Sequence, residues 1–490
     1  MSQKARSTFV FVHPSEILAA LVGLKDVKVL AYRRRGPDVE LMIEQVIGVV
    51  ACPSCGGRTE VKERPVVHYV DLPVYGTPMS LAWKKHRMRC ADRACPKKSW
   101  VLEDHRIAAK NCLLTTRAAK WATVQVGGGR TVKEVADELA CDWHTVNDAV
   151  LTYGEALLAA DRKRMNRTSA IGLDETSFVR LRTAHTAYAT TVADVEHHQI
   201  IDILPSRTFT DVAAWLDKQP QAWKERIRFG ALDMSAAYAA VYSVVLPKAT
   251  QVIDPFHVIS QANRALDAVR RRVQNEQTGH RGRRDDPLYR ARRVLLRGEE
   301  ALDEKATQRL WSLLALGDPG AEVAIAYRIK ERVRDFYRTT DPDEARAMLE
   351  ELQRHCVRKA MPPEVQKLGR TLGNWFDKIC NYHLARVTNG PTEALNNLVK
   401  RIKRIGFGFR NFENYRIRAL PYAGWPNWRC AGLDRRQNQA RGGGLELLLT
   451  RCCLVLLHLD ISWSRPFCVV HPQRSCCRLR PGYGESVTSV

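Results

Sequence analysis

Residues 168–258 contain the feature that most constrains the fold of this chain. Apolar, β-branched runs such as SAIGLDETSFV, QIIDILPS and TQVIDPF are typical of strands. The later runs alternate with segments of helical character around 212–227 and 236–245. Because strands that alternate with helices usually form a partly parallel sheet covered by helices, we expect an α/β layer here. A helical, arginine-rich region follows over residues 259–385.

The charge of the chain indicates its class of partner. Lysine and arginine total 77 residues against 53 aspartate and glutamate residues, which gives a formal net charge of +24. Such an excess attracts polyanions, of which nucleic acid is the first candidate and an anionic membrane surface the second. A solvated basic surface without a partner is the remaining alternative.

No segment is expected to enter a membrane. The N-terminal residues lack the basic region, the clean apolar region and the cleavage site of a signal peptide. No run reaches the ~18 unbroken apolar residues of a membrane span, since the nearest run, LELLLTRCCLVLLHLD, is interrupted by Arg451. We therefore expect a cytoplasmic protein without a membrane partner, in which the 14 cysteines stay reduced.

Two pairs of cysteines are candidate metal ligands. Cys52 and Cys55 form a CxxC pair followed by glycine, and Cys90 and Cys95 form a CxxxxC pair further along the chain. Four thiolates can close a tetrahedral Zn²⁺ site without leaving a position open to water. The long segment between the pairs suits a zinc ribbon, in which a β-hairpin separates two knuckles. A redox CxxC or buried thiols are the alternative.

Residues 131–150 resemble a helix-turn-helix. Thr131 and Glu134 have the spacing of a capping box, residues 140–142 form the expected turn, and Trp143–Val150 is the candidate recognition helix. Any helical hairpin in a small bundle would show a similar pattern, so DNA reading is one of two interpretations. The candidate base contacts are the side chains expected on the outer face of that helix, namely His144, Thr145 and Asn147.

Histidines and basic residues supply further candidates. His86 and His105 lie near the cysteines and are alternative metal ligands. Lysine and arginine side chains position DNA through its phosphates without reading its sequence. The candidate phosphate contacts near the cysteines and in the C-terminal basic segment are Arg87, Arg89, Lys400, Arg401, Lys403 and Arg404.

Three acidic residues are candidates for catalysis. Asp174 and Asp233 each end an apolar strand, and Glu393 lies in the first turns of an expected helix. Acids on two strands of one sheet and on a helix across it can converge on divalent cations, and their hard oxygen atoms suit Mg²⁺ or Mn²⁺. The alternative for each acid is a strand-end turn or a helix cap. Strand alternation directs the neighbouring Glu175 to the opposite face.

The order of several motifs resembles a known family. The chain contains CPSCG, CADRAC, the helix-turn-helix, GLDETSF, ALDMSAAY, VIDPFHV and NGPTEALNNLVKRIKRIGFGFRNF. This order is similar to that of the ISL3 family of bacterial insertion-sequence transposases. The resemblance implies a ribonuclease-H-like mixed sheet with a DDE triad, which matches Asp174, Asp233 and Glu393. Asp254 and His257 match a further family motif and are accessory candidates, either beside the metal site or as a cap of the following helix.

The function that the resemblance implies is DNA transposition. The zinc module and the helix-turn-helix would bind the terminal inverted repeats of an element in double-stranded DNA. Two Mg²⁺ or Mn²⁺ ions on the triad would support cleavage and strand transfer into target DNA. Bringing two ends together implies self-association on DNA. The alternatives are an inactive remnant or DNA-binding regulator that uses only the two N-terminal modules, and a ribonuclease H or junction nuclease on a related fold.

The same observations predict a division of the chain. The helical block separates Asp233 from Glu393, as all-helical insertions do in some DDE transposases, and its basic runs at 270–272 and 281–284 suit end DNA. The tail has paired cysteines and no periodicity, which indicates a shifted reading frame or, alternatively, a second metal site. The expected segments are an N-terminal segment (1–45), a zinc-ribbon-like module (46–106), a helix-turn-helix domain (110–165), the first part of the catalytic core (168–258), the basic helical insertion (259–385), the glutamate helix of the core (386–428) and the atypical tail (429–490).

Overall fold

The computed structural model describes residues 14–24, 26–161, 163–180, 186–424 and 426 of the chain. The predictions for the tail at 429–490 lie outside these described residues. Within the described ranges, no helix combines the length and the apolar character that crossing a membrane requires.

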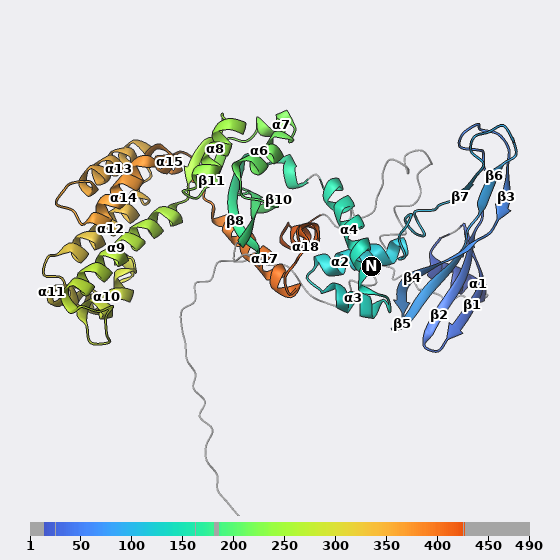
Figure 1. Cartoon of the computed structure of the whole chain (residues 1–490), viewed down its shortest axis with the longest axis horizontal. Coiled ribbons are helices and arrows are strands. Elements are labelled where there is room, and N and C mark those ends of the chain that lie inside the picture. The colour runs from blue at the N-terminus through green and yellow to red at the C-terminus, as the bar shows by residue number, and fades with distance from the viewer. Residues whose placement is uncertain (1–13, 25, 162, 181–185, 425, 427–490) are drawn as a thin grey trace, which may run out of the picture. The chain divides into compact units, whose positions relative to one another are not determined.

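The N-terminal part contains α1 (Pro14–Val22) and two separate sheets (Figure 1). The first sheet has the order β1, β2, β5, β4, with bounds β1 (Val27–Arg35), β2 (Asp38–Gln45), β5 (Thr77–Lys84) and β4 (Val66–Val74). The second sheet is antiparallel and consists of β3 (Thr59–Glu63), β6 (Arg87–Cys90) and β7 (Ser99–Val101).

The first sheet crosses the boundary that was expected at residue 45. The expected hairpin between the two cysteine pairs exists as β4 and β5, but it pairs with β2 rather than with the strands beside the cysteines. Leu41, Ile43, Leu81 and Trp83 explain this difference, because they alternate along β2 and β5 and are all buried in one core. The N-terminal segment and part of the expected zinc module therefore form one layer.

Three helices follow, and they confirm the helix-turn-helix pattern. They are α2 (Thr116–Gly127), α3 (Val132–Glu138) and α4 (Trp143–Ala160). The Thr131 hydroxyl accepts the Glu134 backbone N–H, and the Glu134 side chain accepts the Thr131 N–H, so the capping box is present. At the start of α4, the Asp142 carboxylate accepts the Thr145 backbone N–H and so caps the helix. Helix α4 is longer than expected because buried positions continue along it to Leu158.

The central sheet is mixed and confirms the expected α/β architecture. Its order is β10, β9, β8, β11, β12; the first three strands are antiparallel, and β11 is parallel to both β8 and β12. The strands are β8 (Ala170–Arg180), β9 (Thr186–Asp194), β10 (Gln199–Leu204), β11 (Phe229–Leu232) and β12 (Thr250–Ile253). Helix α5 (Lys163–Asn166) precedes β8. Helices α6 (Phe209–Asp217) and α7 (Gln221–Lys224) connect β10 to β11, and α8 (Ala236–Val245) connects β11 to β12.

A run of helices follows β12 before the chain returns to the sheet. These helices are α9 (Pro255–Thr278), α10 (Pro287–Leu295), η1 (Glu299–Ala301), α11 (Glu304–Gly317), α12 (Glu322–Phe336), α13 (Pro342–Cys356), α14 (Pro363–Asn374), α15 (Phe376–Cys380) and α16 (Tyr382–Ala385). Of the basic run at 270–272, Arg271 is exposed, whereas the other two arginines have partners within the helical region. Arg270 is buried and bonds to Asp267, while Arg272 pairs with Glu322 and Glu364.

The last two described helices join the sheet to the helix-turn-helix. Helix α17 (Gly390–Ile405) packs along β8 and β9, and α18 (Phe412–Gly424) packs against α17, β10, α2 and α4. Buried side chains of α2–α4, the sheet, α17 and α18 belong to one hydrophobic cluster. The helix-turn-helix therefore shares a core with the sheet that carries the candidate acids.

Candidate active site

The register of the central sheet places Asp174 beside Asp233. Leu173 of β8 pairs with Leu232 of β11, so the two aspartates follow at the same level on neighbouring parallel strands. Adjacent strands lie about 4.8 Å apart. Burial, and then the negative charge of Asp233, raise the pKa of Asp174 above its ordinary value. Two partly buried carboxylates at this spacing create a local negative potential that a cation would relieve.

Two asparagines of α17 hold these carboxylates. The Asn396 amide donates to Asp174 Oδ2 at 2.7 Å, and the Asn389 amide donates to Asp233 Oδ1 at 3.0 Å. Gly172 allows this close approach, because a Cβ at that position would overlap Thr392 Oγ1 and Asn389 Oδ1. The first turns of α17 are thereby fixed against the first half of β8.

Glu393 lies on the same face of α17 as the two asparagines. It follows Asn389 by four positions and precedes Asn396 by three, and such residues are neighbours on a helix surface. Its side chain is exposed. The three acids are not gathered as tightly as metal ligands. Possible ligand atoms are found on histidine, cysteine, aspartate and glutamate side chains. In the described part of the chain, only the four cysteines bring three or more of these atoms within 4.8 Å of one another.

Asp254 and His257 complete the surroundings of Asp233. His257 Nε2 lies 3.0 Å from Asp233 Oδ2, and its Nδ1 lies 3.3 Å from Asp254 Oδ2. Hydrogen bonding to Asp233 and then to Asp254 raises the pKa of His257 to about 10. The Asp254 carboxylate makes no side-chain cap of α9; it accepts the Asn389 backbone N–H at 3.0 Å instead. Asp254 thus ties the start of α17 to the end of β12.

The donor set of this site fits hard divalent cations. Asp174, Asp233 and Glu393 offer carboxylate oxygens, which Mg²⁺ and Mn²⁺ prefer. Burial and the nearby charge of Asp233 raise the pKa of Asp174, and the charge of His257 only partly opposes this effect. Asn389 Oδ1 and Thr392 Oγ1 are also buried without a hydrogen-bond partner. Glu175, by contrast, is exposed and pairs with Arg207 at 2.8 Å, so it points away from Asp174 as expected.

The four cysteines lie together and match a zinc centre. The Sγ atoms of Cys52 and Cys95 are 3.7 Å apart, and those of Cys55 and Cys90 are 3.6 Å apart. Tetrahedral coordination with Zn–S bonds near 2.3 Å places the sulfur atoms ~3.8 Å from one another. The backbone N–H of Cys55 contributes most to lowering the pKa of the Cys52 thiol to about 7. Gly56, with φ of +70°, closes the turn after Cys55.

The other candidates around the cysteines have different partners. His86 is buried with its Nε2 3.1 Å from Glu44 Oε1, and neither it nor His105 belongs to the cysteine group. On β6, Arg87 is half-buried and Arg89 is exposed, and they form ion pairs with Glu63 and Glu60 of β3, respectively. Contact of these two arginines with phosphate would require that they leave these exposed pairs, which are weak in water.

Helix α4 presents only part of the expected reading surface. His144 is exposed, but Thr145 and Asn147 are buried. The Thr145 hydroxyl bonds to Asp142, and Asn147 Oδ1 accepts from the Arg418 guanidinium at 2.8 Å. The expectation that Thr145 and Asn147 reach base edges therefore does not fit the structure. Asn147 is covered by α18 through Arg418, and Thr145 is engaged by Asp142, the N-cap of its own helix.

Comparison with known proteins identifies the family. A transposase model of the ISL3 family matches residues 171–419, and the model for the helix-turn-helix domain of transposase family ISL3 matches residues 103–154. The chain belongs to the ISL3 family of DDE transposases. The first match includes Asp174, Asp233 and Glu393, and the second includes most of α4; the cysteine cluster lies outside both.

Individual relatives agree with the family. The transposase for insertion sequence element IS1001 of Bordetella parapertussis is 27% identical over 401 residues, which cover 78% of this chain and 92% of the relative. The transposase for IS1557 of Mycobacterium tuberculosis is 26% identical over 302 residues, covering 56% of this chain and 65% of the relative. A solved Drosophila P element transposase strand transfer complex aligns over 64% of this chain and 93% of its own, with 9% identity and a TM-score of 0.34, which is too low to support a shared fold.

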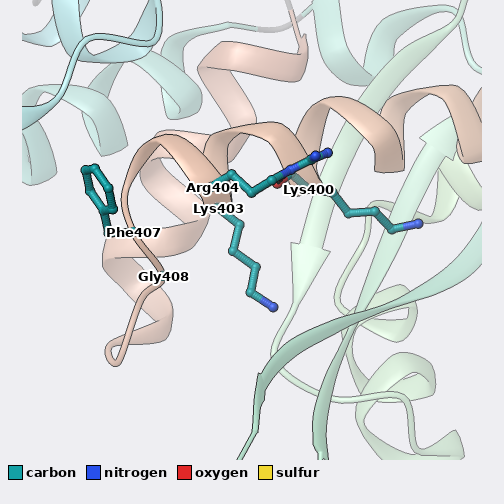
Figure 2. A pocket seen from close by; sticks show the side chains of 5 residues that line it. All are labelled: Lys400, Lys403, Arg404, Phe407 and Gly408. Carbon is teal, nitrogen blue, oxygen red and sulfur yellow. Dashed lines mark hydrogen bonds between the residues drawn. The ribbon is translucent and has the colours of Figure 1, made fainter.

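The basic side chains of α17 form an exposed surface on this transposase. Lys400, Arg401 and Arg404 are exposed, and Lys403 donates to the Ser177 carbonyl of β8 at 2.9 Å. Figure 2 shows Lys400, Lys403 and Arg404 extending from α17 around a hollow that Phe407 and Gly408 also line. The helix that carries Glu393 in its first turn thus carries positive charge in its last turns.

Sequence reasoning missed the two amides that support the aspartates. Asn389 and Asn396 were read as part of a motif without a role of their own. Their spacing of seven positions around Glu393 was the available signal, because residues i, i+4 and i+7 lie on one face of a helix. What the pattern could not show is that this face meets β8 and β11.

Proposed function

We propose that Asp174, Asp233 and Glu393 form the DDE site of this transposase. The observation that carries the proposal is the pairing of Leu173 with Leu232, which sets Asp174 and Asp233 side by side under the helix that bears Glu393. In this proposal the enzyme binds the terminal inverted repeats of its insertion sequence, cleaves the DNA and transfers the freed strand to target DNA. An inactive remnant that only binds element ends is the rival.

We further propose that the catalytic core is ribonuclease-H-like. Support comes from the order β10, β9, β8, β11, β12, with three antiparallel strands followed by two parallel ones. The helices α9–α16 are then an all-helical insertion within this core, and α17 is its glutamate helix. The cysteine cluster with β3, β6 and β7 is a zinc-ribbon-like module. The sheet of β1, β2, β5 and β4 is a separate layer, built from residues on both sides of the boundary expected at residue 45.

Two Mg²⁺ or Mn²⁺ ions held by the three acids would activate the attacking oxygen and stabilise the leaving oxygen of the phosphodiester. Asn389 and Asn396 orient the carboxylates by donating to one oxygen of each aspartate. His257 holds a proton between Asp233 and Asp254 and so limits the negative charge of the cluster. Cys52, Cys55, Cys90 and Cys95 would hold Zn²⁺ in a closed structural site.

The DNA contacts follow from charge and exposure. His144 of α4 is the remaining candidate for base contact, and Arg87, Arg89 and the basic residues of α17 are candidates for phosphate contact. Neutralising phosphates releases counterions, so end binding should weaken steeply with salt. The two ends would be joined by self-association on DNA, and a protein that acts on such DNA would work in the bacterial cytoplasm.

A nicking assay with DNA that carries the element's ends tests the DDE assignment. Asp174→Asn and Glu393→Gln should each reduce Mg²⁺-dependent nicking by about 10³-fold or more, because a ligand of the reacting metal is lost. End binding in a gel-shift assay should stay unchanged. Glu175→Gln is the matched control and should nick normally, since Glu175 faces Arg207. Nicking at the wild-type rate by either triad variant would refute the assignment, and absence of nicking by the wild type would favour the remnant.

A further inference from the structure

The turn after α17 has an unusual residue at its tightest position. The Gly408 backbone N–H bonds to the Lys403 carbonyl at 2.9 Å, and the Phe407 N–H bonds to the Arg404 carbonyl at 3.0 Å. These two bonds define a Schellman motif in which Phe407 occupies the left-handed position that glycine usually takes. Its φ is +52°. A side chain with a Cβ disfavours this conformation, and glycines stand on both sides.

Packing does not explain the phenylalanine either. The Phe407 side chain is 96% exposed, whereas Phe409, two positions later, is buried against Tyr415 with ring centroids 5.5 Å apart. Phe409 therefore supplies the apolar anchor of this turn. Phe407 has neither the backbone preference nor the buried area that would stabilise the fold. A residue that costs stability in both respects suggests a function outside the folded chain.

The surroundings of Phe407 indicate what it contacts. Lys400, Lys403 and Arg404 line one hollow with it, and Figure 2 shows its ring standing apart from these basic side chains beyond the end of α17. A second hollow places Phe407 together with Lys133 of α3 and Trp143 of α4. The ring thus lies where the helix-turn-helix meets the helix that carries Glu393. Exposed aromatic rings beside basic residues are typical of sites that bind unpaired nucleic acid.

We propose that Phe407 stacks on an unpaired base of the cleaved DNA end, while Lys400 and Arg404 contact the flanking phosphates. This proposal rests on the proposed transposase function and deepens it. Helix geometry sets the position of the base, because Glu393 and Phe407 are separated by about 20 Å at 1.5 Å per residue. In a strand that keeps the ~3.4 Å stacking distance of duplex DNA, this span corresponds to about six nucleotides.

The test measures DNA binding without any cleavage step. The full-length protein is titrated, without divalent metal, into a blunt duplex and into the same duplex with an eight-nucleotide oligo(dT) overhang. Single 2-aminopurines scan the overhang. We expect Phe407→Gly to weaken binding of the overhang DNA roughly tenfold and to abolish the 2-aminopurine signal of the wild type, with blunt-duplex affinity unchanged. Phe407→Trp should keep both the affinity for the overhang DNA and the 2-aminopurine signal.

Controls separate stacking from folding and from phosphate contact. Phe407→Gly should not lower the melting temperature, because glycine adopts the left-handed conformation freely. Lys400→Gln should weaken binding of both DNAs alike and reduce the salt dependence. Leu316→Ala, which removes an exposed apolar side chain of α11, should change neither the binding of the two DNAs nor its salt dependence. Equal binding of the overhang DNA by wild type and Phe407→Gly would overturn the stacking proposal. This outcome does not depend on whether the protein nicks DNA. Loss of nicking in the triad variants would leave the stacking proposal intact.

Discussion

The cysteine cluster and the carboxylate site are assembled in different ways. The four thiols come from two short segments, Cys52–Cys55 and Cys90–Cys95, each of which forms a local turn around its pair. The carboxylate site takes Asp174 from β8, Asp233 from the end of β11 and Glu393 from α17, with the long helical insertion between the last two. The first site depends on local chain geometry, and the second depends on strand register and helix docking.

This difference matches the chemistry of the two sites. Four sulfur ligands saturate a tetrahedral ion and exclude water, which suits a structural role. Asn389 and Asn396 each donate to one oxygen of an aspartate, and His257 contacts the second oxygen of Asp233. Glu393 is exposed beside these half-buried carboxylates, so the site is open to solvent, as a catalytic role requires. Locally built sites can therefore stabilise a small module, whereas a site built from distant segments requires the completed sheet.

Of the changes that distinguish the two sites, loss of the cysteine-bound zinc should have the largest effect. Binding of structural zinc contributes about 10 kcal/mol or more to small domains, so Cys52→Ser should lose the metal and expose the strands beside the cysteines to protease. The central sheet should keep its resistance, because its core does not include the cluster. Metal analysis and limited proteolysis measure both effects. Cys112→Ser is the control and should retain zinc; a Cys52→Ser protein with full zinc content would contradict the four-cysteine site.

A smaller effect is expected from the amides that hold the aspartates. Asn396→Leu removes the donor to Asp174 and should lower nicking by about 10–100-fold, with a matching rise in the Mg²⁺ concentration at half-maximal rate. End binding should not change. Asn397→Leu, on the exposed side of the same helix, is the matched control. If both variants nick equally well, Asn396 does not position the carboxylate.

The smallest expected effect is on stability, and it distinguishes the buried side of α4, which carries Asn147, from the exposed side, which carries His144. Burial lowers the pKa of Arg418 to about 10, and Asn147 supplies its hydrogen bond. Asn147→Ala should therefore reduce the free energy of unfolding by about 1–3 kcal/mol, since it leaves a buried guanidinium without this partner. His144→Ala should change stability by less than about 0.5 kcal/mol and weaken end binding. Urea denaturation and gel shifts measure these outcomes. The reverse pattern would restore Asn147 as a base contact.

Local patterns predicted much of this molecule. The capping box at Thr131 and Glu134, the alternating strands of the central sheet and the four-cysteine cluster are all present. The capping box rests on interactions within a few residues and the strands on a repeated apolar period, whereas the two cysteine pairs were marked by their spacing and are brought together by the pairing of β3 with β6. The pairing of β2 with β5 was not predictable in this way, because it depends on which apolar faces meet across long separations. The same limitation applies to Asn147, which bonds to Arg418 of the distant helix α18.

The sequence by itself determined the chemical groups, the helical and extended periods, the basic charge and the family resemblance. Only the tertiary structure decided which of these groups meet. It brought Asn389, Asn396 and His257 to the aspartates, buried two of the three expected base-contacting residues, and left Phe407 exposed. The physical reason is that side-chain type and local period are properties of neighbouring residues, whereas proximity across the chain is set by the burial of apolar faces that no local segment can satisfy alone.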